Sequence, residues 1–275
     1  MNRGGSRRTA WPMLYAVALV LILGPFQGCS LVHHSVAALR STDRFIPNEI
    51  DDRVFFEPGA EVIANKVALF LPSAVNRVEE KQFQRFADPV RVYVCVSRES
   101  FRKFYGADVR AGVLTKLFLS PRIFEFGDDI AEKYVTHELS HLHLLQHIGI
   151  FKMSRLPTWF KEGLATSVSD GGGAHLISPE QAVEAIHSGK NLVPNEADGL
   201  FIRKTPSDFG LEPHLFYRQS MMFVDYLAAI DAPAFRNLML SVEQGERLSA
   251  AIDEAYHNNL DELWRGFLNE VKKKD

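Results

Sequence analysis

The feature that most constrains how this chain folds is a pair of histidines four residues apart inside a long predicted helix. Residues 137–141 read HELSH, and the helix is predicted over Asp128–Ile148, with acidic residues in its first turn and Gly149 as its stop. Residues four apart lie about 40° apart around a helix, so His137 and His141 face the same point. This arrangement predicts that both imidazoles bind one metal ion.

Glu138 lies beside this predicted metal site rather than on it. It follows His137 directly and is therefore turned by about 100° around the helix axis. From that position its carboxylate can accept a proton from a water molecule at the metal. His143 and His147 lie further around the same helix, away from the metal, and are predicted to be packing or surface residues.

A second segment supplies a candidate third ligand. Leu156–Ala165 reads LPTWFKEGLA and falls in a helix predicted over Pro157–Ser169. A short connection lets Glu162 of this helix face back onto the histidines. Two neutral imidazoles and one carboxylate make a three-ligand zinc site with an open position for water, which is the catalytic rather than the structural pattern. The alternative is that Glu162 is a solvated residue near a helix N-terminus, where the helix dipole favours an acid.

Together, HELSH and PTWFKEGLA resemble the gluzincin, or peptidase MA-like, zinc metallopeptidases, which include the thermolysin, aminopeptidase and bacterial collagenase groups. In such enzymes two histidines of one helix and a glutamate of the next hold zinc, which implies His137, His141 and Glu162 as the ligands here. The setting of the glutamate matches the pattern W-x-x-E-G-x-A at residues 159–165. With the C-terminal helices, the resemblance covers about residues 110–275.

The resemblance implies two further roles. Many gluzincins carry an acidic residue one turn after the ligand glutamate, which orients a zinc-bound imidazole. This chain has Thr166 there, and its hydroxyl can accept an imidazole N–H without the charge. Relatives often have a tyrosine at the start of a later helix, whose phenol hydrogen-bonds the oxyanion. Tyr217, near the start of the predicted helix Pro213–Ile230, matches best, with His214 as the substitute. The alternative is that Tyr217 only packs or caps.

The rest of the chain predicts an α+β fold. Apolar residues alternate in Val90–Val96 and Gly112–Ser120, which predicts two strands. The second strand is expected to be the edge along which an extended peptide substrate pairs. Everything after Gly149 has a helical pattern. We therefore expect one zincin-like, two-lobed domain, with a small mixed-sheet lobe and the metal helix over residues 54–148 and an all-helical lobe over residues 149–275. The remaining predicted helices are Glu61–Leu71 and Ser73–Phe86, interrupted at Pro72, then Ser100–Tyr105, Pro179–Ser188, Pro233–Gln244, Arg247–His257 and Leu260–Lys273.

The first 28 residues have the three-part order of an export signal. A basic start is followed by an apolar run at residues 11–23 and by a small residue before Cys29. This run is shorter than the roughly 20 residues that span a bilayer, so a permanent transmembrane helix is the weaker interpretation. Residues 26–29 (FQGC) resemble a bacterial lipoprotein box, which implies acylation of Cys29, a membrane anchor and a tether over residues 29–53. Ser30 would suggest outer-membrane sorting. The alternative is cleavage by an ordinary signal peptidase.

Charge and cysteine content exclude two classes of protein. The chain has 31 Lys and Arg against 34 Asp and Glu, a formal net charge of −3. The first 28 residues hold three arginines and no acid, which leaves 28 bases against 34 acids, or −6, in the rest. This balance argues against a nucleic-acid partner. The two cysteines, Cys29 and Cys95, exclude a disulfide framework, and Cys95 lies in an apolar strand that predicts a buried thiol.

These features predict zinc-dependent hydrolysis of peptide or protein substrates in the bacterial cell envelope. In the implied mechanism zinc lowers the pKa of its water toward about 7, Glu138 takes the proton, and zinc and Tyr217 stabilise the oxyanion. One alternative is a catalytically silent protein of the same fold that acts as an envelope binding or assembly factor, against which the intact Glu138 argues. Another is a non-peptidase zinc hydrolase that acts on cell-wall peptides or amides.

Overall fold

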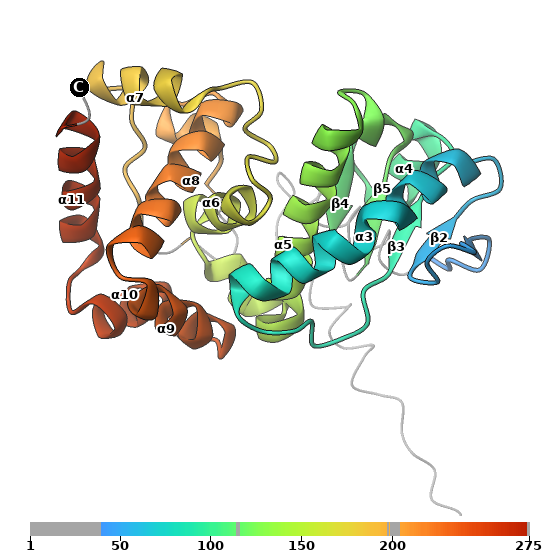
Figure 1. Cartoon of the computed structure of the whole chain (residues 1–275), viewed down its shortest axis with the longest axis horizontal. Coiled ribbons are helices and arrows are strands. Elements are labelled where there is room, and N and C mark those ends of the chain that lie inside the picture. Colours follow the sequence, from blue (N-terminus) through green and yellow to red (C-terminus); the bar gives the residue numbers. More distant parts are fainter. Residues whose placement is uncertain (1–39, 114–115, 197, 199–203, 274–275) are drawn as a thin grey trace, which may run out of the picture.

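The computed structural model describes residues 40–113, 116–196, 198 and 204–273. It confirms the α+β class, with a five-stranded mixed sheet and its helices in the N-terminal part and helices alone afterwards (Figure 1). The N-terminal elements are β1 (Ile46–Pro47), β2 (Val54–Phe56), α3 (Glu61–Gln82), β3 (Val92–Val94), α4 (Arg98–Tyr105), β4 (Ala111–Val113), β5 (Leu117–Leu119) and α5 (Asp128–Arg155). The C-terminal helices are α6 (Thr158–Val168), α7 (Pro179–His187), α8 (Pro213–Ile230), α9 (Ala232–Glu243), α10 (Leu248–Tyr256) and α11 (Leu260–Lys273).

The sheet has the strand order β1-β2-β3-β5-β4. Strands β2, β3 and β5 are parallel, whereas β1 and β4 pair antiparallel at the two edges. Strand β4 packs next to α5. A Cβ atom at Gly112, in the middle of β4, would lie 2.1 Å from the ring of Tyr105, so only glycine lets this ring cover the strand. The edge strand β4 is therefore held between α4 and the long helix α5.

Side chains alternate across the sheet with the period of two that strands require. In β3, Val92 and Val94 belong to the core cluster shared with α3 and α5, whereas Tyr93 and the following Cys95 belong to a second cluster with α4. Helices α3 and α5 thus cover one face of the sheet and α4 covers the other (Figure 1). Burial raises the pKa of the Cys95 thiol to about 12, so this cysteine is a buried structural residue, as predicted.

Helix α3 is a single helix, and the predicted interruption at Pro72 was wrong. Pro72 lies on the exposed side of the helix, so the backbone hydrogen bond that it cannot make is lost at the solvent face. The buried face continues on both sides of the proline, with Val67 and Leu71 before it and Val75 and Val78 after it. This face packs on α5, and its burial outweighs the cost of one proline.

The segment Gly112–Ser120 forms two strands, not the single strand predicted. Strands β4 and β5 are an antiparallel hairpin in which Val113 pairs with Leu117 and Ala111 pairs with Leu119. Directly paired residues share one face of a sheet, so a hairpin in this register keeps the alternating pattern of one continuous strand. The edge expected over the whole segment is therefore β4 alone, and β5 lies inside the sheet.

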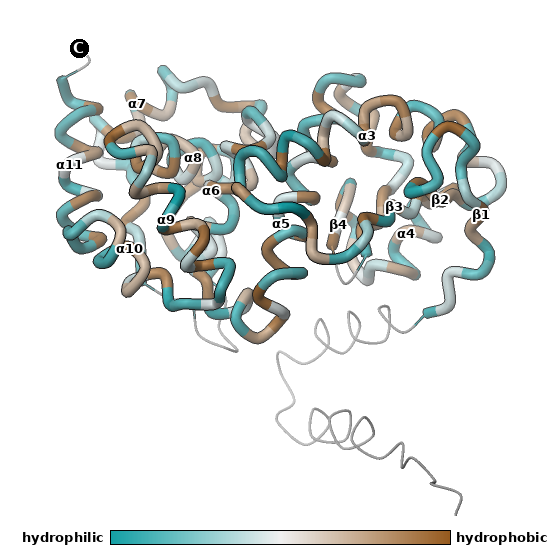
Figure 2. Tube along the Cα trace, turned by 60° about the horizontal axis from the view of Figure 1, so that its bottom comes forward, coloured by the Kyte–Doolittle hydropathy of each residue, from teal (hydrophilic) through white to brown (hydrophobic). Residues whose placement is uncertain are grey.

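Gly149 ends the regular part of α5, as predicted. Its φ of 71° and ψ of 166° lie outside the helical region, and a further helical stretch continues to Arg155. Each predicted C-terminal helix is present, and its ends lie within one residue of the predicted ones. Buried apolar residues from Val54 in β2 to Val271 in α11 form one cluster. Figure 2 shows hydrophobic stretches in α3, β4 and α5. The two parts of the chain therefore share one core.

The chain enters the sheet before Val54. Strand β1 pairs with β2, and the ring of Phe45 packs edge-on against Tyr93 with centroids 5.2 Å apart. Part of the segment assigned to the tether thus belongs to the folded domain. The predicted export signal and Cys29 lie outside the described residues. Among the helices that the structure describes, none has both the length and the apolar character needed to cross a membrane.

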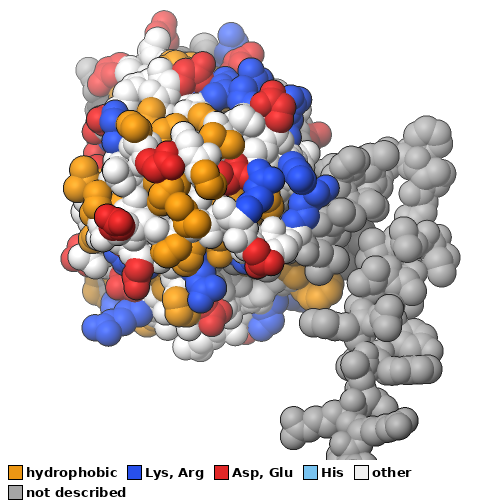
Figure 3. Space-filling model, turned by 90° about the vertical axis from the view of Figure 1, so that its right-hand side faces the viewer, with side chains coloured by type: hydrophobic (Ala, Val, Ile, Leu, Met, Phe, Trp, Pro, Cys, Tyr) orange, Lys and Arg blue, Asp and Glu red, His pale blue; other side chains and the backbone are white. Residues whose placement is uncertain are grey.

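The end of the molecule formed by the sheet is shown in Figure 3. Apolar side chains lie in the middle of this face, and Lys, Arg, Asp and Glu side chains surround them. Exposed apolar residues of this part of the chain include Ile46, Ile50 and Val62. Apolar residues that are interspersed with charges of both signs are ordinary on a protein surface, so we assign no role to this face.

Candidate metal centre

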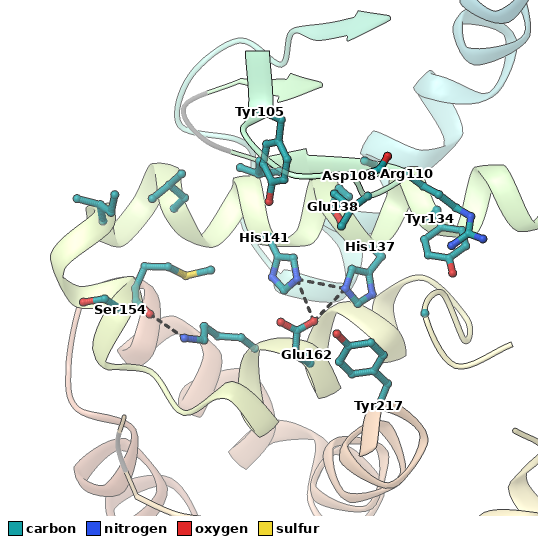
Figure 4. Close-up of a pocket in the computed structure, with 18 of the residues that line it drawn as sticks. Tyr105, Asp108, Arg110, Tyr134, His137, Glu138, His141, Ser154, Glu162 and Tyr217 are labelled. Carbon is teal, nitrogen blue, oxygen red and sulfur yellow. Dashed lines mark hydrogen bonds and ion pairs between the residues drawn. The ribbon is translucent and has the colours of Figure 1, made fainter. Parts of the chain in front are cut away.

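The structure brings His137, His141 and Glu162 together. The Nε2 atoms of the two histidines are 3.1 Å apart, and Oε2 of Glu162 lies 3.2 Å from Nε2 of His137 and 3.4 Å from Nε2 of His141 (Figure 4). Ligand atoms at about 2.0–2.2 Å from a tetrahedral metal ion are themselves about 3.3–3.6 Å apart. The three atoms therefore form a triangle that could hold a metal ion with little rearrangement.

This group is buried. His137 and Glu162 are each 5% exposed, and the side chain of His141 is 15% exposed. The pKa of His137 is raised, because the hydrogen bond and the charge of Glu162 outweigh burial, which by itself lowers the pKa. A buried carboxylate that faces two imidazoles creates a negative potential, and this potential favours a cation at their meeting point.

Two helices carry the ligands, and a glycine lets a third helix approach them. Helix α5 carries both histidines, and α6 carries Glu162. A Cβ atom at Gly163 would lie 2.6 Å from the backbone oxygen of Ser220 in α8, so the close approach of α6 and α8 requires glycine at this position. This approach brings the start of α8, with Tyr217, to the metal centre.

A backbone carbonyl, and not Thr166, accepts the hydrogen bond of a ligand imidazole. Nδ1 of His137 donates to the carbonyl oxygen of Gly172 at 3.0 Å, which leaves Nε2 available to a metal ion. The two glycines that flank Gly172 have φ of 95° and 85°, in the left-handed region that favours glycine. Thr166 is buried in α6, and its Oγ1 has no hydrogen-bond partner among the described residues. The role expected of Thr166, to accept an imidazole N–H and orient the ring, is therefore filled for His137 by the loop after α6.

The metal centre lies in a cleft of about 820 Å³. Strand β4 lines one side of the cleft, and residues of α6, α8 and the loop after α6 line the other. Glu138 lines it as well, on the side of β4, whereas His137 and His141 point to Glu162 (Figure 4). Glu138 is thus beside the three candidate ligands, where a residue that takes a proton from water is expected.

Of the two candidates for the oxyanion donor, Tyr217 lines the cleft. Its ring centroid is 6.2 Å from that of His137, and its side chain points from α8 toward the three ligands (Figure 4). His214 instead packs edge-on against His175, with ring centroids 4.9 Å apart, and does not line the cleft. The position of Tyr217 fits a hydrogen-bond donor to substrate, and that of His214 fits a packing residue.

Helix α6 is anchored by Asp198, which the sequence analysis did not identify. Oδ2 of Asp198 accepts hydrogen bonds from the backbone N–H and the hydroxyl of Thr158, at 3.0 and 2.7 Å. Trp159 donates its indole N–H to the carbonyl of Asn195 at 2.8 Å. These bonds satisfy the backbone N–H of Thr158 and hold the first turn of the helix that carries Glu162. No local signal marks Asp198, because it lies 40 residues from Thr158 in the chain.

His143 and His147 face away from the metal centre, as predicted. Nε2 of His143 donates to the carbonyl of Gln84 at 3.0 Å, and Nε2 of His147 donates to the carbonyl of Arg85 at 2.9 Å. Nδ1 of His143 lies 3.4 Å from Oε1 of Glu243 in α9. These contacts fix α5 to the segment after α3 and to α9, on the side of α5 that faces away from His137 and His141.

Two further residues at the cleft were not identified from the sequence. Gly172 stands in a run of three glycines between two helices, and this run is the signal that could have indicated a tight loop. Arg110 directly precedes β4 and lines the cleft. A single arginine in a polar segment carries no such signal, so only the fold shows that it belongs here.

No model of a protein family matches this chain, and no curated protein matches it. The functional conclusion therefore depends on the site itself, on the chemistry of its residues and on their geometry.

Proposed function

We propose that this chain is a zinc metallopeptidase of the gluzincin type. The observation that carries the proposal is the convergence of His137, His141 and Glu162 in a cleft that Glu138 also lines. Two imidazoles and one carboxylate suit zinc, and three protein ligands leave a position open. When bound, zinc would lower the pKa of a water molecule toward about 7 and polarise a peptide carbonyl.

The side chains around the ligands would perform the proton transfers. The carboxylate of Glu138 would accept a proton from the attacking water and pass it to the nitrogen of the departing amine. The phenol of Tyr217 would donate a hydrogen bond to the carbonyl oxygen as negative charge develops on it. The carbonyl of Gly172 keeps a proton on Nδ1 of His137 and so keeps Nε2 free of one.

An extended peptide fits the shape of the site. Ala111 and Val113 of β4 line the cleft. One side of β4 pairs with β5, and the other side pairs with no strand among the described residues. Backbone groups along such an edge can pair with an added strand, which would place a peptide bond of the substrate across the cleft. This geometry favours peptide or protein substrates over compact small molecules.

The test compares zinc content and hydrolysis between the wild type and Glu138→Gln, with an unfolded protein as substrate. The amide keeps the shape of the carboxylate but cannot accept the proton, so zinc content should be unchanged and the rate should fall by at least about 10²–10⁴-fold. Glu132→Gln is the matched control, because Glu132 lies on the same helix, bonds Ser73 at 3.2 Å and does not line the cleft. This control should keep full activity.

Four outcomes would contradict the proposal. A wild-type protein that is prepared without chelators and holds no zinc, or a His141→Ala variant that keeps its zinc, would exclude the site. Equal rates for the wild type and Glu138→Gln, on any substrate that the wild type cleaves, would exclude this base. A zinc-loaded protein without hydrolytic activity would favour the envelope binding or assembly factor instead.

We further propose that the protein is exported and anchored to a membrane through an acylated Cys29, on the periplasmic face of the outer membrane in a bacterium with two membranes. The support is the order of basic, apolar and small residues before Cys29, together with Ser30 after it. This anchor would place the peptidase in the cell envelope.

A further inference from the structure

The cleft extends past Glu138 to an end that carries arginine. Arg110 lies at this end, together with Asp108 and Tyr134 (Figure 4), and Arg122 also lines the cleft. Elsewhere the cleft is lined by apolar residues such as Leu145 and Met153 and by Lys161, whose Nζ donates to the carbonyl of Met153 at 3.3 Å and lies 4.0 Å from Oδ2 of Asp198. The arginine end of the cleft therefore offers a charge to a substrate.

Arg110 is held in a defined orientation. Its guanidinium carbon lies 4.6 Å from the ring centroid of Phe126 and 5.8 Å from that of Tyr134. Nη2 donates to Oε2 of Glu125 at 2.9 Å, whereas the buried Nε has no hydrogen-bond partner among the described residues. The side chain is 24% exposed. Two aromatic rings and one ion pair fix the planar group, and a guanidinium fixed in this way suits bidentate binding of a carboxylate.

The acids nearby leave the guanidinium of Arg110 accessible to an anion. Oε2 of Glu125 is shared, because Nη2 of Arg122 also lies 3.0 Å from it. Asp108 pairs with Arg98 and lies 3.9 Å from Arg122. With Glu138, which also lines the cleft, the group contains three arginines and three acids, so the case for an anion depends on the position of Arg110 and not on a surplus of charge. Because Glu125 is 43% exposed, an incoming anion can compete with it for Arg110.

We infer that Arg110 binds a carboxylate of the peptide substrate and so sets the specificity of the site, an inference that rests on the proposed peptidase function. Tyr134, against which Arg110 packs, lies one turn before Glu138 on α5, about 6 Å along the helix axis. An extended peptide advances about 3.3 Å per residue, so the carboxylate belongs one or two residues from the cleaved bond. It comes either from an Asp or Glu side chain or from the C-terminus of the substrate.

The experiment uses zinc-loaded protein and a peptide whose cleaved bond has been mapped by mass spectrometry. One arm compares Glu with Gln at each of the two positions on either side of that bond. The other arm compares a free C-terminal carboxylate with a C-terminal amide. In one of the arms the wild type should prefer the charged peptide by about 10- to 100-fold in kcat/KM, since a hydrogen bond to a charged group is worth about that much. The arm that responds identifies the source of the carboxylate.

Variants then assign the preference to Arg110. Arg110→Gln should bring the ratio of kcat/KM for the charged peptide to kcat/KM for the uncharged peptide close to one, whatever the absolute rates of this variant. Arg110→Lys should keep part of the preference, because it retains the charge but not the planar fork. Arg98→Gln is the control, since Arg98 belongs to the same group of charges and does not line the cleft. It should keep the wild-type ratio.

Equal rates on charged and uncharged peptides in the wild type would overturn the inference. An unchanged ratio in Arg110→Gln, or an equal loss in Arg98→Gln, would also overturn it. A failure of the proposed function is distinct, because the zinc-loaded wild type would then cleave none of the peptides. In that case the dissociation constants of the same peptide pairs for the wild type and Arg110→Gln provide the measurement, and equal constants would refute carboxylate binding at Arg110.

Discussion

The substitution Glu243→Gln should raise the free energy of unfolding at neutral and higher pH. Glu243 lies in α9, where it contacts His143 of α5. Glu243 and His143 have side chains that are 0% exposed, and Oε1 of Glu243 lies 3.4 Å from Nδ1 of His143. Nε2 of His143 donates to a backbone carbonyl, and Nδ1 accepts from the side-chain amide of Gln82 at 3.2 Å, so Oε1 of Glu243 is buried without a hydrogen-bond partner among the described residues. Gln84 donates to Oε2 of Glu243 at 2.6 Å. A glutamine at position 243 has a similar shape and can still accept the hydrogen bond of Gln84 through its amide oxygen, without ionising.

The magnitude follows from the two pKa values. Burial raises the pKa of Glu243 from 4.5 to about 7, so native protein holds a proton between these values that the unfolded chain has lost, and stability falls as pH rises through this window. Ionisation of Glu243 therefore lowers the free energy of unfolding by up to about 3 kcal/mol above pH 7. Burial lowers the pKa of His143 from 6.5 to about 4, so the unfolded chain holds the extra proton there, and stability rises with pH. The two slopes oppose each other over about pH 4.5–6.5.

The assay is urea unfolding of wild type and Glu243→Gln in chelator at several pH values. The difference between the two proteins cancels the contributions of other groups. It should be near zero at pH 4 and should grow in favour of Glu243→Gln to about 2–3 kcal/mol at pH 8. Glu246→Gln, an exposed glutamate close by in the chain, is the control and should match the wild type throughout. A difference that does not change with pH would refute the reasoning.

Three more outcomes are expected. A Cβ atom at Gly172 would lie 2.5 Å from the carbonyl of Lys133, so Gly172→Ala should displace the carbonyl that holds His137 and weaken zinc binding by about 10–100-fold in competition with a chromophoric chelator. Gly266→Ala in α11, whose Cβ atom would lie 2.5 Å from the hydroxyl of Tyr226 in α8, should keep the wild-type affinity. Tyr217→Phe should keep its zinc and lose about 10²–10³-fold in rate, so a loss larger than that of the general-base variant would contradict its role. Cys29→Ser should move the protein from the membrane fraction to the soluble periplasmic fraction, and a soluble wild type without lipid would indicate plain secretion.

Features that depend on neighbours along the chain could be predicted from the sequence. The C-terminal helices were located to within one residue because prolines and glycines mark their ends. The convergence of His137 and His141 follows from the pitch of a single helix, so it holds wherever that helix lies. The same applies to the directions of Glu138 and of His143, which are set by rotation about the same axis. The relative position of the two candidate histidine ligands is therefore determined by local geometry, whereas Glu162 comes from the next helix.

Features that depend on packing between distant segments required the tertiary structure. Pro72 and the hairpin of β4 and β5 were misjudged because their outcome depends on a buried face and on strand pairing, not on periodicity. The carbonyl of Gly172 replaces Thr166 because the loop after α6 folds back onto α5. Arg110 reaches the cleft only because β4 ends the sheet beside α5. Contacts of this kind join residues that are far apart in the chain. Their geometry depends on how the helices and strands pack, and a local sequence pattern does not predict that packing.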